Sequence, residues 1–282
     1  MSNTVSVRVP ATTANIGPGF DTLGVALELY NTITISPGAK TWPDAFMQEA
    51  AHEFFLTAEI KPEAFSVQIA GDVPPSRGLG SSVTVRLGII AALNKFHGSP
   101  LDREKILDLV IGLEGHPDNA VPAFHGGFAV STRQTYAHVP VSPELKFVAV
   151  IPDYEVETKE ARKVLPADVS LEHAVENIQY SGLIVLAFAT SNYELLRGAF
   201  RDHLHQPYRS KLIPACEATF DAAEDAGALG AFISGSGSTL MAVTLDNPEA
   251  VANAMKQALT GAGAKNLKHH VLNADNQGVV IL

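Results

Sequence analysis

The sequence is poor in cysteine and charged residues, and it has no long apolar run. One cysteine among 282 residues, Cys216, excludes an intramolecular disulfide and a thiolate metal cluster, as is typical of reducing compartments. The most apolar stretch, residues 182–189, is far shorter than the ~18 residues that cross a bilayer. Residues 5–9 alternate like a strand and show no signal-peptide pattern. We therefore expect a cytoplasmic protein without a membrane-spanning segment.

Basic residues are also scarce. Twenty Lys and Arg stand against 30 Asp and Glu, a formal net charge of −10, which disfavours nucleic-acid and anionic-membrane surfaces. A small-molecule site fits better. The length and the 46% hydrophobic content exclude general disorder and allow one large or two medium domains. Neither G-x-x-x-x-G-K-[ST] nor a complete G-x-G-x-x-G occurs, so a Walker loop and a dinucleotide fingerprint are both excluded.

Strand-like and helix-like segments alternate along the chain. Period-two alternation and short apolar runs predict strands at 5–9, 23–30, 32–35, 65–69, 128–130, 146–151, 231–233 and 240–243, and residues 278–282 form a short apolar terminus. Apolar spacing of three and four residues predicts helices within 37–64 and at about 82–96, 102–114, 170–198, 209–226 and 247–260. We expect two α+β halves with a seam near 130–146, divided as residues 1–144 and 145–282.

The glycine-rich loop at residues 74–82 is the most informative segment. Gly78 and Gly80 allow a tight turn that points successive N–H groups at one place, and a predicted helix follows directly. Such a loop suits an anion. Ser81 and Ser82 could cap the helix, bind a phosphate oxygen or ligate a hard cation. The alternative is an ordinary glycine turn with a serine N-cap.

A second polar cluster, Glu114-Gly115-His116-Pro117-Asp118-Asn119, ends the helix predicted at 102–114. Phosphoryl transfer needs a carboxylate for Mg²⁺ and a group that orients or deprotonates the attacking hydroxyl, and this cluster offers both. The alternative is a helix end followed by a turn rich in Asp, Asn and Pro. A metal site made of His116 and His125 is disfavoured, because nine residues across a loop is no recognised ligand spacing.

Two further loops could contact a ligand. Residues 15–21, Asn-Ile-Gly-Pro-Gly-Phe-Asp, could hold a small polar substrate or merely connect two strands. Residues 234–239, Ser-Gly-Ser-Gly-Ser-Thr, follow a predicted strand; their backbone could approach a ligand or pack as a tight turn against a neighbouring loop.

Taken in order, these segments resemble a known family. VPATTANIGPGFD at 9–21, PSRGLGSS at 75–82, EGHPDNAVPA at 114–123 and SGSG at 234–237 resemble the successive motifs of the GHMP small-molecule kinases, and among these the homoserine kinases. The resemblance runs nearly end to end and is weakest across 37–64. It implies an α+β fold with a ribosomal-protein-S5-domain-2-like N-terminal domain, a ferredoxin-like C-terminal domain and ATP between them.

The resemblance also implies an activity and a set of site residues. It implies transfer of the ATP γ-phosphate to the side-chain hydroxyl of L-homoserine, a step of threonine biosynthesis, by a possible homodimer. Residues implied to surround the ATP phosphates are Pro75, Ser76, Arg77, Gly78, Leu79, Gly80, Ser81 and Ser82. Those implied to hold Mg²⁺ are Ser82 and Glu114. Those implied to bind homoserine are Asn15, Asp21, His116, Asn119, Arg162 and Arg209. The implied catalytic set is Glu114, Asp118, Asn119 and Thr158.

Mevalonate kinase and similar relatives are thought to use an Asp as base, and Asp118 or Asn119 fills that place here. Because an amide cannot accept a proton, we expect Glu114 to hold the metal, Asn119 to orient the substrate, and no strong general base. A guanidinium fork suits a carboxylate, so Arg162 and Arg209 fit an amino-acid substrate, although either could be a plain surface residue.

The sequence departs from the family at Val83, Ser238 and Arg86. Arg86 stands where an apolar residue is expected, one helical turn after Ser82, and could reach the phosphates or extend to solvent. Two other functions compete with the main one: a GHMP kinase for a different small alcohol, and a binding protein without turnover. The acidic and basic candidates for an amino-acid clamp count against the first, and intact Ser82 and Glu114 count against the second.

Overall fold

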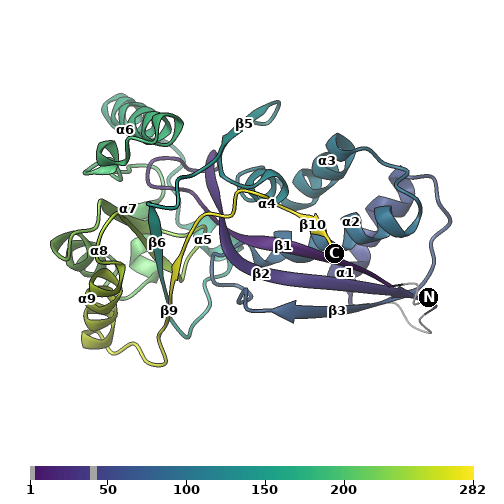
Figure 1. Ribbon diagram of the computed structural model, residues 1–282. Helices are drawn as coiled ribbons and strands as arrows, with labels where there is room; N and C mark the ends of the chain where they lie inside the picture. Colours follow the sequence, from purple (N-terminus) through teal and green to yellow (C-terminus); the bar gives the residue numbers. More distant parts are fainter. Residues whose placement is uncertain (1–3, 39–42) are drawn as a thin grey trace.

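The computed structural model describes residues 4–38 and 43–282, which form two antiparallel sheets with helices packed on them (Figure 1). The first sheet has the order β10-β1-β2-β4-β5, with β3 paired to β2. Its strands are β1 (Val5–Ala14), β2 (Leu23–Pro37), β3 (Phe65–Gly71), β4 (Phe128–Ser131), β5 (Tyr136–Val139) and β10 (Val280–Ile281). The second sheet has the order β7-β8-β6-β9: β7 (Gly230–Ile233), β8 (Leu240–Thr244), β6 (Lys146–Ile151) and β9 (Lys268–Leu272).

Helices α1 (Ala45–Thr57), α2 (Ser81–Phe96) and α3 (Arg103–Glu114) pack together beside the first sheet, and α2 lies against β1 and β2. Its buried residues include Leu87, Ile89 and Ile90, which belong to one apolar core with the buried residues of the two strands. Gly88 lets α2 approach the sheet closely, because a Cβ there would collide with Ile33. The contact fixes α2, and with it the glycine-rich loop at its start.

Local signals set the ends of α3. Asp102 caps the helix by accepting a hydrogen bond from the Lys105 N–H at 2.8 Å, and Gly115 ends it in the left-handed region at φ 80°. Glu114 is therefore the last residue of the helix. The short helix α4 (Ala120–His125) follows, with Pro122 in its first turn, where proline is tolerated.

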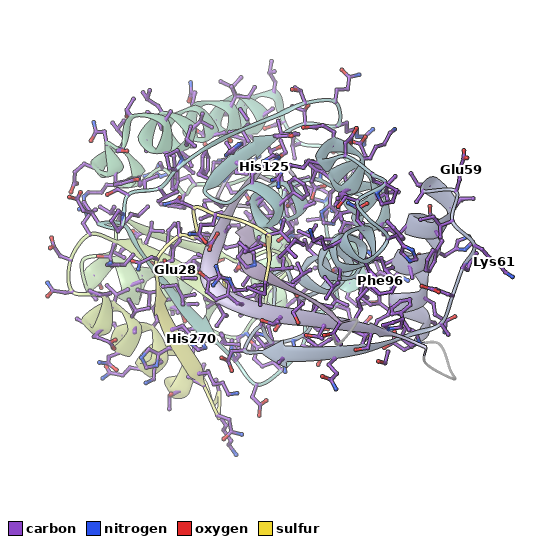
Figure 2. The ribbon with its side chains drawn as sticks, turned by 45° about the vertical axis from the view of Figure 1, so that its right-hand side comes forward. Glu28, Glu59, Lys61, Phe96, His125 and His270 are labelled. Atoms are coloured by element: carbon purple, nitrogen blue, oxygen red, sulfur yellow. The ribbon has the colours of Figure 1, made fainter. Side chains whose placement is uncertain are left out.

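The second sheet is covered on one side by α8 (Cys216–Asp225) and α9 (Pro248–Gly261), which share an apolar core with β6, β7 and β8. Helix α6 (Leu171–Thr190) instead packs toward both sheets, since Phe188 stacks on Phe128 of β4 with ring centroids 4.1 Å apart. The remaining short elements are α5 (Thr158–Lys163), η1 (Tyr193–Leu196), α7 (Gln206–Arg209) and η2 (Ser210–Leu212). In Figure 2, Phe96 of α2 and His270 of β9 lie toward opposite ends of the molecule.

Most predicted elements are present, with several differences. The helix predicted within 37–64 is α1, and residues 39–42 lie outside the described part. The strands predicted at 23–30 and 32–35 form one continuous strand, β2. The helix predicted at 170–198 ends at Thr190, because Ser191 adopts a left-handed conformation, and the one at 209–226 is divided into α7, η2 and α8. β5 lies within the predicted seam, and β9 was not predicted.

The two-domain α+β architecture is confirmed. The division at residues 144 and 145 stays a prediction: β1 to β5 precede it and β6 to β9 follow it, while β10 returns to pair with β1. Among the described helices, none is long and apolar enough to span a membrane.

Candidate active site

A cavity of about 650 Å³ joins residues from both halves of the chain. It is lined by Asn15, Phe46, Pro75, Ser76, Arg77, Gly78, Gly80, Ser81, Ser82, Val85, Arg86, Glu114, His116, Asn119, Thr158, Lys159, Arg162, Arg209, Gly235 and Ser236. The four motifs singled out in the sequence thus meet at one place. Of the predicted site residues, Leu79, Asp21 and Asp118 do not line the cavity.

The glycine-rich loop forms one wall of the cavity. Gly80 is the N-cap of α2 at φ 66°, and no side chain caps the helix, so its first N–H groups face an anion-binding position. A Cβ on Gly80 would collide with Thr12 Oγ1, and one on Gly78 with the Ser234 carbonyl. Buried Leu79 accepts a hydrogen bond through its carbonyl from the Thr12 N–H at 3.2 Å. Protein packing therefore requires both glycines, whether or not a ligand is bound.

A hydroxyl and a carboxylate meet at the start of α2. Ser82 Oγ donates a hydrogen bond to Glu114 Oε2 at 2.9 Å. The other carboxylate oxygen, Oε1, accepts a hydrogen bond from Arg86 Nη1 at 2.9 Å. The Glu114 side chain is 7% exposed. A hydroxyl and a carboxylate oxygen are hard donors, and their position beside an anion-binding helix N-terminus fits Mg²⁺ held with phosphate oxygens.

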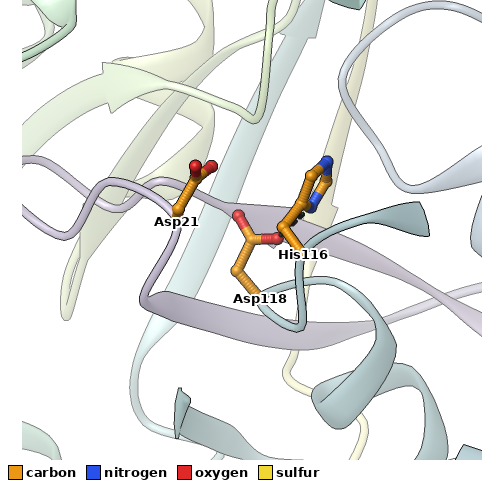
Figure 3. A group of neighbouring side chains, drawn as sticks. All are labelled: Asp21, His116 and Asp118. Carbon is orange, nitrogen blue, oxygen red and sulfur yellow. Dashed lines mark hydrogen bonds and ion pairs between the residues drawn. The ribbon is translucent and has the colours of Figure 1, made fainter. Parts of the chain in front are cut away.

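His116, Asp118 and Asp21 form a compact group, in which each offers an atom within 4.8 Å of the others' (Figure 3). His116 Nδ1 and Asp118 Oδ1 lie 2.7 Å apart, and Asn119 Nδ2 donates to the same oxygen at 3.4 Å. The hydrogen bond to Asp118 raises the pKa of His116, although burial opposes the shift. Asp118 is fully buried, and its Oδ2 has no hydrogen-bond partner among the described residues. Asp118 thus does not line the cavity, and its carboxylate lies between the side chains of its neighbours His116 and Asp21 (Figure 3).

Two guanidinium groups line the same cavity beside Phe20. Arg162 forms a two-pronged ion pair with Asp21, at 2.8 and 3.0 Å, and its Cζ lies 5.4 Å from the centre of the Phe20 ring. Arg209 is 1% exposed, and its Cζ lies 4.9 Å from the same ring. Burial and the nearby Arg162 charge lower the pKa of Arg209 to about 10, so it remains protonated at neutral pH. Asp21 pairs with Arg162, whereas Arg209 forms no ion pair among the described residues, so its guanidinium can attract an anion.

Backbone carbonyls hold Arg209 in place. Its Nε donates to the Ala161 carbonyl at 3.2 Å, and its Nη1 donates to the Gly235 carbonyl at 2.9 Å. Asn15 is also anchored: Nδ2 donates to the Gly235 carbonyl at 3.0 Å, and Oδ1 accepts from the Asp21 N–H at 2.8 Å. The loop at 234–237 therefore supports both the 15–21 loop and Arg209, which explains why its backbone comes close to the site.

Sequence reasoning missed three residues of the cavity, Phe46, Val85 and Lys159, whereas it gave ligand contact by the loop that holds Gly235 and Ser236 as one of two interpretations. The 234–239 loop carried a signal in its glycines, whereas Phe46 appeared only as one apolar position of a predicted helix. The sequence left two alternatives for the Arg86 side chain, contact with the nucleotide phosphates or extension into solvent. Its side chain is only 13% exposed, and its guanidinium contacts Glu114 and Glu49.

Two family models and several related proteins match the amino-acid sequence of this chain. The model of the GHMP kinases N terminal domain matches residues 45–127, and that of the GHMP kinases C terminal domain matches residues 184–261. A homoserine kinase of Clostridium beijerinckii is 40% identical, covering 99% of this chain and 98% of its own. One of Aquifex aeolicus is 38% identical, covering 98% and 99%.

Solved structures agree. The crystal structure of a homoserine kinase from Cytophaga hutchinsonii superposes with a TM-score of 0.91 at 27% identity, over 100% of this chain and 98% of that one. A mevalonate kinase superposes with a TM-score of 0.74 at 16% identity, over 96% and 99%, which shows the shared fold alone.

Proposed function

The chain belongs to the homoserine kinases of the GHMP kinase family, and we propose that it transfers the γ-phosphate of ATP to the side-chain hydroxyl of L-homoserine, giving O-phospho-L-homoserine. One observation carries the proposal: a single cavity is lined by an uncapped, glycine-rich helix N-terminus and by two guanidinium groups. The first suits a nucleotide phosphate chain, and the second suits the carboxylate of an amino acid. The site therefore has places for both reactants.

On the nucleotide side, the backbone from Pro75 to Ser82 would surround the phosphates, with the N–H groups that open α2 directed at them. Ser82 and Glu114 would hold Mg²⁺, since they already place two hard oxygens 2.9 Å apart at this helix end. When bound, Mg²⁺ neutralises charge that develops on the phosphoryl oxygens.

On the substrate side, Arg162 and Arg209 would bind the homoserine carboxylate and Asp21 its ammonium group. The ion pair between Asp21 and Arg162 already presents one group of each sign, 2.8 Å apart, to a zwitterion. Asn15, His116 and Asn119 line the same cavity and would complete the pocket. A sugar or an isoprenoid alcohol would leave the buried charge of Arg209 without a counter-ion, which counts against another small alcohol as substrate.

No strong base is assigned to the hydroxyl. Asp118 is buried against His116, whereas Asn119 faces the cavity and is held by Thr12, whose Oγ1 donates to its Oδ1 at 2.7 Å. Asn119 would orient the hydroxyl, and Thr158, at the start of α5, would lie beside the transferred phosphate. A loose transition state for phosphoryl transfer can depend on positioning and electrostatics more than on proton removal.

A coupled assay of ADP release tests the activity. We expect turnover with L-homoserine and little with mevalonate, galactose or an amino alcohol that lacks the carboxylate. If another alcohol is phosphorylated as efficiently as L-homoserine, the assignment of homoserine as the specific substrate would be wrong. If the protein binds ATP but releases no ADP with any of the alcohols, the alternative of a binding protein without turnover would be favoured.

We propose further that two copies pair through α6. Leu171, Val175, Ile178 and Leu186 are 81%, 43%, 73% and 48% exposed, and they follow one another at four-, three- and eight-residue intervals along one helix face. No charged side chain occurs from Gln179 to Thr190, so a second copy of the helix meets no like charge around Leu186, whereas Glu172 and Glu176 stand beside the other three residues in the sequence.

The pairing is tested by measuring the molar mass of Ile178→Glu in solution by light scattering. Leu56→Glu is the control, because it changes a 64% exposed leucine of α1, outside the proposed interface. Only the first variant should be monomeric, and two dimeric variants would refute the interface. The cytoplasm is the proposed place of action, since ATP is available there and the single cysteine is buried.

A further inference from the structure

Arg86 is a charged residue of the candidate active site to which the proposed reaction assigns no role. It lies one turn after Ser82 on α2, and its guanidinium contacts two other helices. Nη1 donates to the Leu113 carbonyl at 2.7 Å and to Glu114 Oε1 at 2.9 Å, both on α3. Nη2 donates to Glu49 Oε2 on α1 at 2.6 Å. Its Cζ also lies 4.6 Å from the centre of the Phe46 ring.

These contacts divide the Glu114 carboxylate between two partners. Arg86 holds Oε1, and Ser82 holds Oε2 at 2.9 Å. A carboxylate held at one oxygen can rotate about its own axis, whereas one held at both oxygens has a fixed plane. Arg86 therefore determines which oxygen of Glu114 remains beside Ser82 and the glycine-rich loop.

The guanidinium is anchored and does not act as a free cation. A carbonyl, two carboxylates and an aromatic ring fix it, and its side chain is 13% exposed. Its single positive charge lies between the carboxylates of Glu49 and Glu114, so the three groups together keep a net charge of −1. A divalent cation beside Glu114 consequently still meets a negative environment.

We propose that Arg86 is a positioning residue of the kinase site: it presents Oε2 of Glu114, together with Ser82, to the metal that accompanies the nucleotide. The inference rests on the proposed function, in which Ser82 and Glu114 hold Mg²⁺. Groups that orient a metal ligand from behind typically change metal affinity by about 10- to 100-fold when they are removed. Arg86 would act through Glu114, without contact with the reacting atoms.

Calorimetric titration with a non-hydrolysable ATP analogue, in Mg²⁺ and in EDTA, tests this role without relying on turnover. In Mg²⁺, Arg86→Met should weaken binding about tenfold or more, while metal-free binding should change by less than about twofold. In a Glu114→Gln background, Arg86→Met should have little further effect on binding in Mg²⁺, because the carboxylate through which Arg86 acts has already been removed.

Three results would overturn the proposal. Equal losses with and without Mg²⁺ would mean that Arg86 contacts the nucleotide or only shapes the pocket. A full effect in the Glu114→Gln background would mean that it does not act through that carboxylate. Tighter binding in Mg²⁺ would mean that its charge opposes the metal.

Controls separate this inference from the proposed function. If Mg²⁺ does not strengthen analogue binding to the wild type, or if Glu114→Gln does not reduce that effect, then the proposed metal site is wrong whatever Arg86 does. If both behave as expected and Arg86→Met binds like the wild type, only the present inference fails.

Glu49→Gln is the matched control, because it removes a half-exposed partner of Arg86 and leaves the contact with Glu114. It should weaken binding in Mg²⁺ by no more than about fivefold. A loss as large as that of Arg86→Met would overturn the assignment to Glu114. If Arg86→Met does not melt cooperatively, Arg86→Lys replaces it as the test, because lysine keeps the charge but lacks the planar fork. Arg86→Lys should bind the ATP analogue more weakly in Mg²⁺ but not in EDTA. Weaker binding in EDTA as well would refute the positioning role.

Discussion

Replacing Arg209 by Lys should separate homoserine binding from ATP binding. The fork of Arg209 donates to two backbone carbonyls, those of Ala161 and Gly235, and its face covers Phe20. An ammonium group keeps the charge but cannot reproduce this planar arrangement or a two-pronged contact with a carboxylate. The substitution therefore changes the geometry of the proposed carboxylate clamp while the local charge stays the same.

The structure gives a magnitude for this change. One lost hydrogen bond to a charged group corresponds to about 1.5–3 kcal/mol, or roughly a 10- to 100-fold rise in the homoserine KM. The ATP KM should change little, because the described hydrogen bonds and ring contact of Arg209 involve none of residues 75–82, which are proposed to surround the phosphates. Stability should also fall, since the buried carbonyls that Arg209 satisfies would lose a partner.

Steady-state kinetics with each substrate varied in turn, together with a thermal melt, provide the measurement. Arg162→Lys is the comparison: Arg162 is 38% exposed and hydrogen-bonds Asp21, so it should raise the homoserine KM with less loss of stability. An unchanged homoserine KM in Arg209→Lys, or an equal rise in both KM values, would show that Arg209 is not a carboxylate ligand.

Three further predictions concern the metal site, the glycine loop and a half-buried histidine. Glu114→Ala should lower kcat by about 10²-fold or more, whereas Asp118→Asn should cost much less; an equal loss in a cooperatively melting protein would identify Asp118 as a base. Gly80→Ala should lower the melting temperature, because its Cβ has no room, whereas Gly112→Ala, where nothing lies within 4 Å, should not; equal melts would contradict this account. Burial lowers the pKa of His125 in the folded protein to about 4. In the unfolded chain the same side chain has a pKa of about 6.5, so between about pH 6.5 and pH 4 only the unfolded chain binds the proton. The free energy of unfolding should therefore fall as the pH is lowered from about 6.5 to about 4. Urea unfolding at several pH values should show a smaller fall in His125→Gln; equal slopes would refute the assignment.

Local pattern predicted much of the fold. The helices α1 and α3 bury one face, mainly against α2, so their apolar spacing was visible in the sequence. Helix α2, which lies against β1 and β2, is buried along most of its length, and its long apolar run after the glycine loop marked it as a helix. The strand β9, Lys-His-His-Val-Leu, was not predicted, because it has no clear alternation. It exists because β6 offers it a free edge, and such long-range pairing leaves no local signal.

The site was predicted through its motifs, but the partners of its residues were not. Asp118 was either a candidate catalytic carboxylate or part of an ordinary turn, and the sequence did not indicate that it is fully buried against His116. Arg209 looked like a possible surface residue, since burial of a charge is normally unfavourable; the carbonyls that make burial possible come from residues 48 and 26 positions away in the sequence. The partners of Arg86 on α1 lie in the region where the resemblance is weakest.

The supports of the two reactant sites meet at the loop of residues 234–237. Ser234 Oγ donates to the Gly78 carbonyl at 2.6 Å, which ties this loop to the phosphate side. The Gly235 carbonyl accepts hydrogen bonds from Asn15 and Arg209, which ties it to the substrate side. Because the same four residues hold both walls of the cavity, a shift of this loop would move the nucleotide and the amino acid relative to each other. Its glycines therefore matter for alignment of the reactants even though the proposed reaction assigns no chemistry to them.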